Sequence, residues 1–326
     1  LRFIGIFSNN LDEFFQVRYA TVKRIADTKP NAKNNKDNIA AKKLLDEITS
    51  KVINLQAESS LILDSIEKSL KKENIVFINE KEVIESHKEF LKDYFIRKIS
   101  PALVTVILSN NKLHDFKDNK AFLITSIKLV DNTNIYALVE IPSDISRFVV
   151  LPKKDNKQYI MLIDDIIRYH LDIIFSFLNY SHIEAHMLKI TRSAEFDIDD
   201  MDLSKSYIKK IQEYVNKRKI SNPVRLVYDK SISNLTLAYL IKKIKITSYD
   251  SLIPGGKYHH RSDYMNFPDL QRSDLLYPKE ESLDIKDFKI ESNLLDQMLS
   301  RDFLMYTPYH SFSYLVSVLR QSAIDP

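Results

Sequence analysis

Glycine is nearly absent from this chain, and its scarcity excludes two common nucleotide-binding folds. The 326 residues contain three glycines, Gly5, Gly255 and Gly256. Neither a Walker P-loop nor the GxGxxG turn of a dinucleotide-binding domain can be written with glycines at these positions. Any phosphate group that the chain binds must therefore be held by side chains or by helix N-termini.

The absence of cysteine and the balanced charge narrow the class of protein further. Without cysteine there is no disulfide, no thiolate metal ligand and no cysteine nucleophile, which fits a cytoplasmic protein. The 48 basic and 44 acidic residues give a net charge of +4, too small to indicate a nucleic-acid partner. No apolar run approaches the roughly 18 residues of a membrane span. The length predicts about two ordinary globular domains.

The first 24 residues have the most distinctive pattern in the chain. An apolar start is followed by Ser8, Asn9 and Asn10, and then by an amphipathic segment. We expect Ser8 or Asn9 to cap a helix that carries Asp12 and Glu13 in its first turn. Side-chain amides beside a helix N-terminus suit a polar ligand, because free backbone N–H groups point the same way. The alternative is an ordinary capped amphipathic helix that binds nothing.

A long helix should follow this segment. Apolar residues recur every three to four positions from Leu45 to Leu70, which predicts one amphipathic helix. The polar segment 27–38 contains Pro30 and is expected to be an exposed loop, so the long helix should fold back on the first as an antiparallel hairpin. Residues 1–74 are therefore predicted to form an N-terminal helical domain. The lysines of the long helix indicate a solvated face, and less directly a polyanion-binding one.

Residues 75–285 predict a middle domain of α+β class with a mainly antiparallel sheet. Strands at 121–130 and 134–142 are separated by a tight hairpin-type connection. We expect further strands at 147–152, 159–163, 186–190 and 225–228, and helices at 164–177 and 235–244. The last segment, 286–326, carries two helices on either side of a Thr-Pro turn, and its final apolar stripe has nothing downstream to cover it. Because the chain also starts without methionine, we expect it to be a fragment of a longer protein.

Several blocks of the sequence resemble one known family. The opening string IFSNNLDEFFQVRYATVKR resembles the N-terminal signature of type 1 polyphosphate kinase. Further similar blocks follow in the same order over nearly the whole chain: ALVEIPSDISRFVVLP at 137–152, IDDIIR at 163–168, KITRSAEFD at 189–197, PVR at 223–225, YDSLIPGGKYH at 249–259, NFP at 266–268 and YTPYHSF at 306–312. In the block KITRSAEFD, Ser193 stands where the family usually has aspartate.

This resemblance implies a fold and an activity. The family has an N-terminal helical domain, a middle domain used in dimer contacts, and two C-terminal domains that resemble phospholipase D. It transfers the terminal phosphate of ATP reversibly to inorganic polyphosphate, with Mg²⁺, through a phosphohistidine. The chain contains no HxK motif, so the nucleophile is expected beyond it, and residues 286–326 would be the truncated start of the first catalytic domain. Among the family's ligands, only the nucleotide-contacting asparagine of the SNNLDEF block falls within this chain, as Asn10.

Other candidate sites have simpler explanations. His182 and His186 are four residues apart, but Glu184 between them is expected to point elsewhere and no third metal ligand is evident. His259, His260 and Asp263 could bind metal or phosphate, and the Gly-Gly loop explains them equally well. Arg192 could hold an anion, but an ion pair between Arg192 and Glu195 or Asp197 is the simpler explanation. The acidic residues Asp197, Asp199, Asp200 and Asp202 could bind a hard cation, but they lack the glycine and the terminal glutamate of an EF-hand, and we expect a solvated helix start. His310 lies in the matched block at 306–312, which we expect to be a turn and helix start.

The sequence therefore predicts a portion of a polyphosphate kinase that contacts ATP or ADP through Asn10 and holds no catalytic or metal-binding residue. The resemblance further implies polyphosphate as a partner, a homodimer or homotetramer, and no nucleic acid. It implies a cytoplasmic location, and leaves open a peripheral attachment to the inner face of the membrane. We expect the chain to be inactive alone. The alternative is a non-catalytic oligomerisation or polyanion-binding module.

Overall fold

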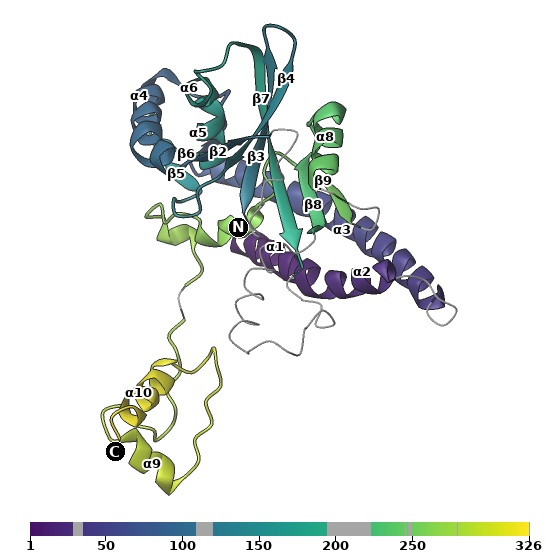
Figure 1. The fold of residues 1–326 in the computed structure, drawn as a ribbon. Helices are drawn as coiled ribbons and strands as arrows, with labels where there is room; N and C mark the ends of the chain where they lie inside the picture. The colour runs from purple at the N-terminus through teal and green to yellow at the C-terminus, as the bar shows by residue number, and fades with distance from the viewer. Residues whose placement is uncertain are drawn as a thin grey trace. The chain divides into compact units, whose positions relative to one another are not determined.

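The computed structural model describes residues 1–28, 35–108, 120–193, 223–244, 246, 250–278 and 280–325. The chain divides into two compact units, Leu1–Pro268 and Asp269–Pro326 (Figure 1). The first unit holds both sheets and the long helices, and the second holds two short helices. Among the described residues, no helix is both long enough and apolar enough to cross a membrane.

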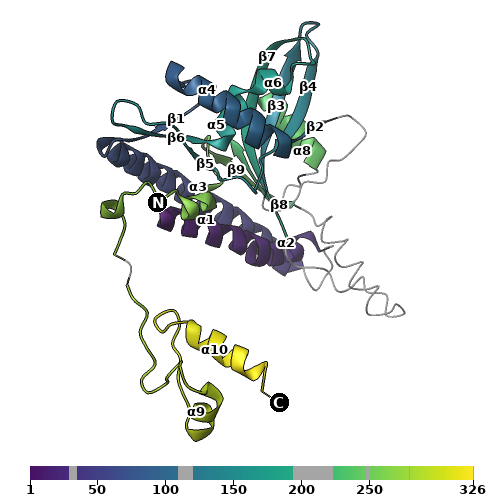
Figure 2. The same cartoon turned by 90° about the vertical axis from the view of Figure 1, so that its left-hand side faces the viewer.

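The N-terminal helices form the predicted antiparallel hairpin. Helix α1 (Arg2–Phe14), the π-helical turn η1 (Phe15–Tyr19) and α2 (Ala20–Asp27) follow one another without a break, and α3 (Asn35–Lys72) returns beside them (Figure 2). Asn38 of α3 donates to the carbonyl oxygens of Ile25 and Thr28 at 3.0 and 2.7 Å. The long helix is confirmed, but the predicted stripe is its packing face only in part: Leu45 and Val52 are buried, whereas Leu55 and Ile62 are exposed.

The predicted start of the first helix was wrong. Helix α1 begins at Arg2, with Leu1 as its N-cap, so Ser8 lies inside the helix and not at its end. Its buried residues Ile4, Gly5, Ser8 and Asp12 are one to four positions apart, and the inward-facing stripe therefore runs straight through the polar triplet. Tertiary burial of that stripe outweighs the capping preference of serine and asparagine.

A six-stranded sheet lies at the centre of the first unit. Its strands in spatial order are β2 (Val104–Ile107), β4 (Asn134–Glu140), β3 (Ala121–Leu129), β7 (Tyr180–Arg192), β8 (Pro223–Asp229) and β9 (Ser251–Gly255). All neighbouring strands pair antiparallel except β8 and β9, which are parallel. The predicted hairpin between β3 and β4 is confirmed, and Asn132 in its turn has a φ of 67°.

A second sheet has three strands. Strand β1 (Ile75–Ile78) pairs parallel to β6 (Gln158–Leu162), and β5 (Phe148–Val150) pairs antiparallel to β6. The α+β class is thus confirmed, but both sheets are mixed and not simply antiparallel. The parallel pairs join segments that are distant in sequence, and no local turn pattern indicates such a pairing.

Helices cover both faces of the six-stranded sheet. On one face Leu123 and Ile127 of β3 pack in a core with helices α4 (Glu85–Tyr94) and α5 (Ile163–Tyr169). On the other face the alternate residues Phe122 and Ile124 belong to the core beneath α8 (Asn234–Ile244; Figure 1). Because both faces are covered, β3 is a nearly continuous apolar run.

The predicted helix 164–177 is interrupted. Helix α5 ends at Tyr169 and α6 (Leu171–Ile174) follows it, with His170 between them at φ −114° and ψ 25°. The Nδ1 atom of His170 lies 2.8 Å from the Ile166 carbonyl oxygen, and the ring stacks on Phe95. A side-chain contact with the backbone of the preceding turn competes with continuing the helix.

The second unit has its own small core. Helices α9 (Leu294–Ser300) and α10 (Ser313–Ser322) are the two helices predicted for this segment. The Asn293 side chain caps α9 by accepting from the backbone N–H groups of Leu295 and Asp296. The buried apolar residues of this unit include Ile285, Phe288, Leu294 and Tyr314.

Glu67 on α3 gives a pH-dependent test of the helix packing. Burial, and then repulsion from Asp64, raises the pKa of Glu67 to about 6, from 4.5. Well below the unfolded pKa the carboxyl is protonated in both the folded and the unfolded chain, so it does not change the stability. As the pH rises through the folded pKa the buried carboxyl ionises, and the folded state is destabilised. We therefore expect Glu67→Gln to raise the free energy of unfolding by about 1 kcal/mol near pH 7.5 and to change little near pH 4. Urea titrations at the two pH values test this.

The control for this prediction is Glu47→Gln, an exposed position on the same helix whose side chain lies 3.8 Å from Lys43. It should change stability by less than about 0.5 kcal/mol at either pH. Equal stabilisation by Glu67→Gln at both pH values would contradict the burial argument.

Candidate functional site

Asn10 lies on the solvent-exposed side of α1, next to exposed Asn9 and buried Ser8. Because the helix begins at Arg2, the backbone N–H groups of these three residues lie inside it and are not free helix-end donors. The expected combination of amides with a free helix N-terminus is therefore wrong. Asn10 still presents a side-chain amide, which can both donate and accept hydrogen bonds.

Asp12 anchors α1 to the six-stranded sheet. Its Oδ2 accepts from the Lys189 ammonium of β7, and its Oδ1 accepts from the Arg225 guanidinium of β8. Arg225 also donates to Thr191 Oγ1 at 2.8 Å, and its guanidinium carbon lies 4.4 Å from the centre of the Phe15 ring. Asp12 is 8% exposed, and Lys189 and Arg225 are each 1% exposed. We call these three charged residues the Asp12 cluster.

The cations decide the charge state of Asp12. Burial alone would raise the pKa of its carboxyl, but Lys189 and Arg225 together outweigh burial and lower that pKa below its usual range. Burial lowers the pKa of Lys189, and the Asp12 carboxylate opposes this change. The carboxylate is thus held ionised between two cations.

Two more contacts hold the N-terminal helices in place. A Cβ atom on Gly5 would lie 2.6 Å from Met265 Cγ and 2.8 Å from its backbone nitrogen, so α1 approaches the 3₁₀ helix η5 (Arg261–Asn266) at a distance that only glycine allows. On α2, the buried Lys23 donates to Asp250 and, at 2.9 Å, to the Pro223 carbonyl oxygen.

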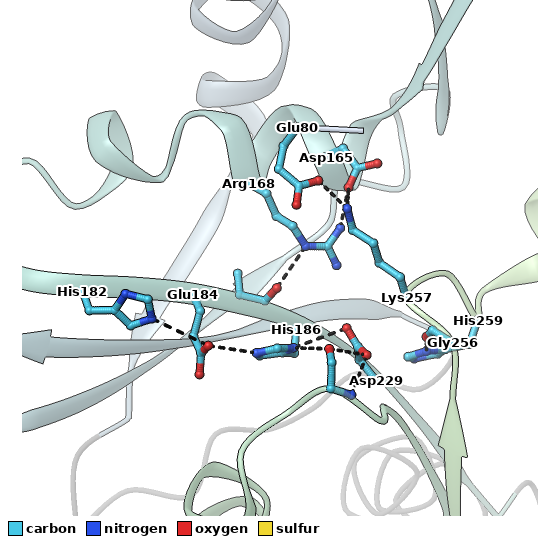
Figure 3. A network of polar contacts seen from close by, with 12 residues as sticks. Glu80, Asp165, Arg168, His182, Glu184, His186, Asp229, Gly256, Lys257 and His259 are labelled. Atoms are coloured by element: carbon cyan, nitrogen blue, oxygen red, sulfur yellow. Dashed lines mark hydrogen bonds and ion pairs between the residues drawn. The ribbon is translucent and has the colours of Figure 1, made fainter. Parts of the chain in front are cut away.

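A cleft of about 600 Å³ lies beside β7 in the first unit (Figure 3). Every second residue of a strand points to the same side of the sheet. This side of β7 therefore carries His182, Glu184 and His186. Glu184 Oε2 lies 3.8 Å from His182 Nε2 and 3.6 Å from His186 Nε2. The expectation that Glu184 points away from the two histidines was therefore wrong, because it assumed a helical spacing.

Several charged groups beside this cleft contact the buried Asp165 or one another. Asp165 accepts from Arg168 Nη1 at 2.8 Å and also from Tyr258, and lies 3.0 Å from Lys257 Nζ. Lys257 also donates to Glu80, on the same wall of the cleft (Figure 3). Burial raises the pKa of Asp165 to about 6 in spite of these cations. These contacts tie α5 to Lys257 and Tyr258 of the loop after β9, and through Lys257 to Glu80.

The histidine pair of the Gly-Gly loop makes internal contacts. His259 is buried, its Nδ1 lies 3.1 Å from the Gly256 carbonyl oxygen, and burial lowers its pKa to about 3. Asp263 contacts His260 Nδ1 at 2.9 Å and Arg147 Nε at 3.1 Å. These contacts support the loop explanation over a ligand site.

The remaining candidates divide between described and undescribed residues. Arg192 is buried at the end of β7, whereas its expected partners Glu195 and Asp197 and the acidic residues up to Asp202 lie outside the described residues. His310 accepts a hydrogen bond from the Tyr306 backbone at 2.9 Å, as a turn residue. Within the ranges that the structure describes, no group of three histidine, aspartate or glutamate residues could hold a metal ion.

The Asp12 cluster was not predicted, although a signal for it exists in the sequence. Lys189 follows His-Met-Leu and Arg225 stands between valine and leucine, so each is a charged residue inside an apolar strand. A charge at a position buried on both faces requires a buried partner of opposite charge. The distance along the chain, 177 residues from Asp12 to Lys189, prevented the pairing from being inferred.

Comparisons with known proteins match the whole chain. The family model described as the polyphosphate kinase N-terminal domain matches residues 1–78, and that of the polyphosphate kinase middle domain matches residues 86–267. The polyphosphate kinases of Vibrio parahaemolyticus and Escherichia coli K12 are each 32% identical to this chain, over 334 and 337 residues. The solved polyphosphate kinase of Porphyromonas gingivalis superposes on the full chain with a TM-score of 0.74 at 25% identity, and the match covers 45% of that chain.

The fold and the anchored helix define an α+β protein whose N-terminal helical hairpin is fixed to a mixed sheet. The chain belongs to the polyphosphate kinase family. It is covered completely by the two bacterial relatives and spans 47% and 48% of their lengths, about half.

Proposed function

We propose that this chain is the N-terminal and middle portion of an enzyme that reversibly transfers the terminal phosphate of ATP to inorganic polyphosphate. Its contribution to the nucleotide site is the Asn10 amide. The observation that carries this proposal is the exposed position of Asn10 on a helix that buried ion pairs fix to the sheet. Phosphoryl transfer depends more on positioning and charge neutralisation than on covalent chemistry by the scaffold.

The phosphohistidine and the Mg²⁺ ligands are proposed to lie in the half of the relatives' length that this chain does not span. The absence of an HxK motif from the sequence supports this division of labour. We retain residues 1–74 as the nucleotide-facing helical domain, 75–285 as the middle domain, and 286–326 as the start of a phospholipase D-like catalytic domain. The middle domain is proposed to form a homodimer or homotetramer in the cytoplasm, either free or attached peripherally to the membrane.

Labelled ATP tests the activity. The 326-residue chain and the full-length protein that carries it are each incubated with ATP labelled at the terminal phosphate and with Mg²⁺. We expect acid-stable polymer and acid-labile phosphohistidine only with the full-length protein. Sustained transfer by the 326-residue chain would contradict the proposed division.

Asn10→Ala tests the nucleotide contact. In the full-length protein we expect this substitution to raise KM for ATP about tenfold, because one amide hydrogen bond of about 1.4 kcal/mol is lost. The control is Asn9→Ala, an exposed asparagine next to it, which should leave KM within about twofold. Equal effects from the two substitutions would contradict the assignment of Asn10.

A non-catalytic polyanion-binding module is the second candidate, favoured by exposed lysines of α3 such as Lys43, Lys51, Lys71 and Lys72. Such a module would bind polyphosphate with steep salt dependence and no preference for adenine nucleotides. Weak adenine-nucleotide binding that is lost in Asn10→Ala would exclude this reading.

A further inference from the structure

Asn10 and Asp12 lie on opposite sides of the same helix. Each residue of an α-helix is rotated by about 100° around the helix axis from the one before it, so Asn10 and Asp12, two positions apart, are rotated by about 200° from each other. Asn10 is accordingly exposed while Asp12 points into the sheet. Any change in the contacts of Asp12 that rotates α1 therefore moves the Asn10 amide in the opposite direction.

The contacts of Asp12 restrict both rotation and sliding of α1. Its two carboxylate oxygens bind different strands, since one accepts from Lys189 on β7 and the other accepts from Arg225 on β8. Arg225 is itself oriented by two hydrogen bonds to Thr191 Oγ1, at 3.2 Å from Nε and 2.8 Å from Nη2. A carboxylate held at both oxygens has one orientation, unlike a single flexible ion pair.

A second contact fixes the distance between α1 and the 3₁₀ helix η5. Gly5 lies against Met265 more closely than a side chain would permit, on the other side of Asn10 along the helix. The exposed Asn10 amide thus lies on a part of α1 that is held in place at Gly5 and at Asp12. A misplacement of about 1 Å at a positioning group can reduce reaction efficiency by up to about a hundredfold.

We propose that Lys189 and Arg225, acting through Asp12, are positioning residues that aim the Asn10 amide at the nucleotide. This inference rests on the proposed function, because it requires Asn10 to contact ATP. Neither cation reaches the nucleotide itself, since both are buried beneath α1. Their effect should therefore appear in KM for ATP and should depend on the presence of Asn10.

The test is a double-mutant cycle in the full-length protein. We expect Lys189→Met to raise KM for ATP about fivefold with a smaller change in kcat. In the Asn10→Ala background the same substitution should raise KM by less than twofold, because no amide remains to be positioned. Thr191→Val is a milder second variant that keeps every charge but loosens Arg225, and it should act in the same direction with a smaller effect.

Lys23→Met is the matched control. It also removes a buried lysine that ties the N-terminal helices to the rest of the unit, through Asp250, but it lies on α2 beyond the π-helical turn. It should lower Tm by an amount comparable to Lys189→Met and leave KM for ATP within twofold of the parent. A KM that rises equally in both lysine variants, or a Lys189→Met effect that persists undiminished without Asn10, would overturn the positioning role.

The single substitution Asn10→Ala distinguishes a failure of the proposed nucleotide contact from a failure of the proposed positioning role. If that substitution leaves KM for ATP unchanged, the nucleotide role of Asn10 is wrong and the positioning role fails with it. If Asn10→Ala raises KM while Lys189→Met and Thr191→Val do not, only the positioning role is overturned.

Discussion

Asp12→Asn should lower the free energy of unfolding by about 3–5 kcal/mol, because it leaves two buried cations without a counter-charge. Lys189 and Arg225 are both about 1% exposed, so neither can recover its hydration by turning outward. Urea denaturation of the 326-residue chain, followed by circular dichroism, measures the change. Exposed Glu13, the next residue on α1, gives the control Glu13→Gln, for which we expect a change below about 0.5 kcal/mol.

Two further measurements establish the cause of this loss. Asp12→Asn combined with Lys189→Met should be more stable than Asp12→Asn alone, because one uncompensated cation has been removed. The pKa of Asp12 is lowered in the folded chain, so its stabilising effect is present above its ordinary value of 3.8 and is lost as the pH falls below it. The difference between the parent and Asp12→Asn should therefore shrink in acid. A loss below about 1 kcal/mol at neutral pH would contradict the buried-cluster argument.

Phe15→Ala should lower the free energy of unfolding by about 3–5 kcal/mol through loss of buried apolar area and the cavity that remains. Phe15 is fully buried in the core that joins the N-terminal helices to β8 and β9. Its ring centre lies 4.7 Å from that of Tyr19 and 4.4 Å from the guanidinium carbon of Arg225. Both interactions are lost together with the packing.

The neighbouring phenylalanine provides a matched control for this prediction. Phe14 meets the Phe15 ring edge-on at 5.7 Å but is only partly buried, so Phe14→Ala should cost less than half as much. The comparison is made by thermal and urea unfolding of the same chain. Equal losses from the two substitutions would show that Phe15 is not the packing centre of this interface.

Local periodicity predicted most of the elements but not their ends. The three-to-four spacing from Leu45 to Leu70 predicted α3, and the alternating and apolar runs predicted β3, β4 and β8, because these patterns are set by geometry along the chain. Helix α1 begins earlier than its capping residues suggested. Capping contributes only about 1 kcal/mol, and the buried residues of α1, Ile4, Gly5, Ser8 and Asp12, continue on both sides of the expected cap.

In the candidate site, too, local sequence patterns predicted some features and the tertiary structure was needed for others. The string of residues around Asn10 was sufficient to indicate the family, and both family models match the chain in the expected order. Which side of the helix Asn10 occupies followed only from the buried position of Asp12. Similarly, Glu184 was placed between two histidines once β7 proved to be a strand that extends back to Tyr180.

The family, the α+β class, the helical hairpin and the exclusion of glycine-rich phosphate loops could all be predicted from the amino-acid sequence. All of these depend on residue types and on spacings within short segments. Three features became visible only in the folded structure: Asp12, Lys189 and Arg225 share one buried cluster, β8 and β9 run parallel, and Gly5 lies against Met265. Each of these contacts joins segments distant along the chain, and burial and charge compensation select the partner only once the whole unit has folded.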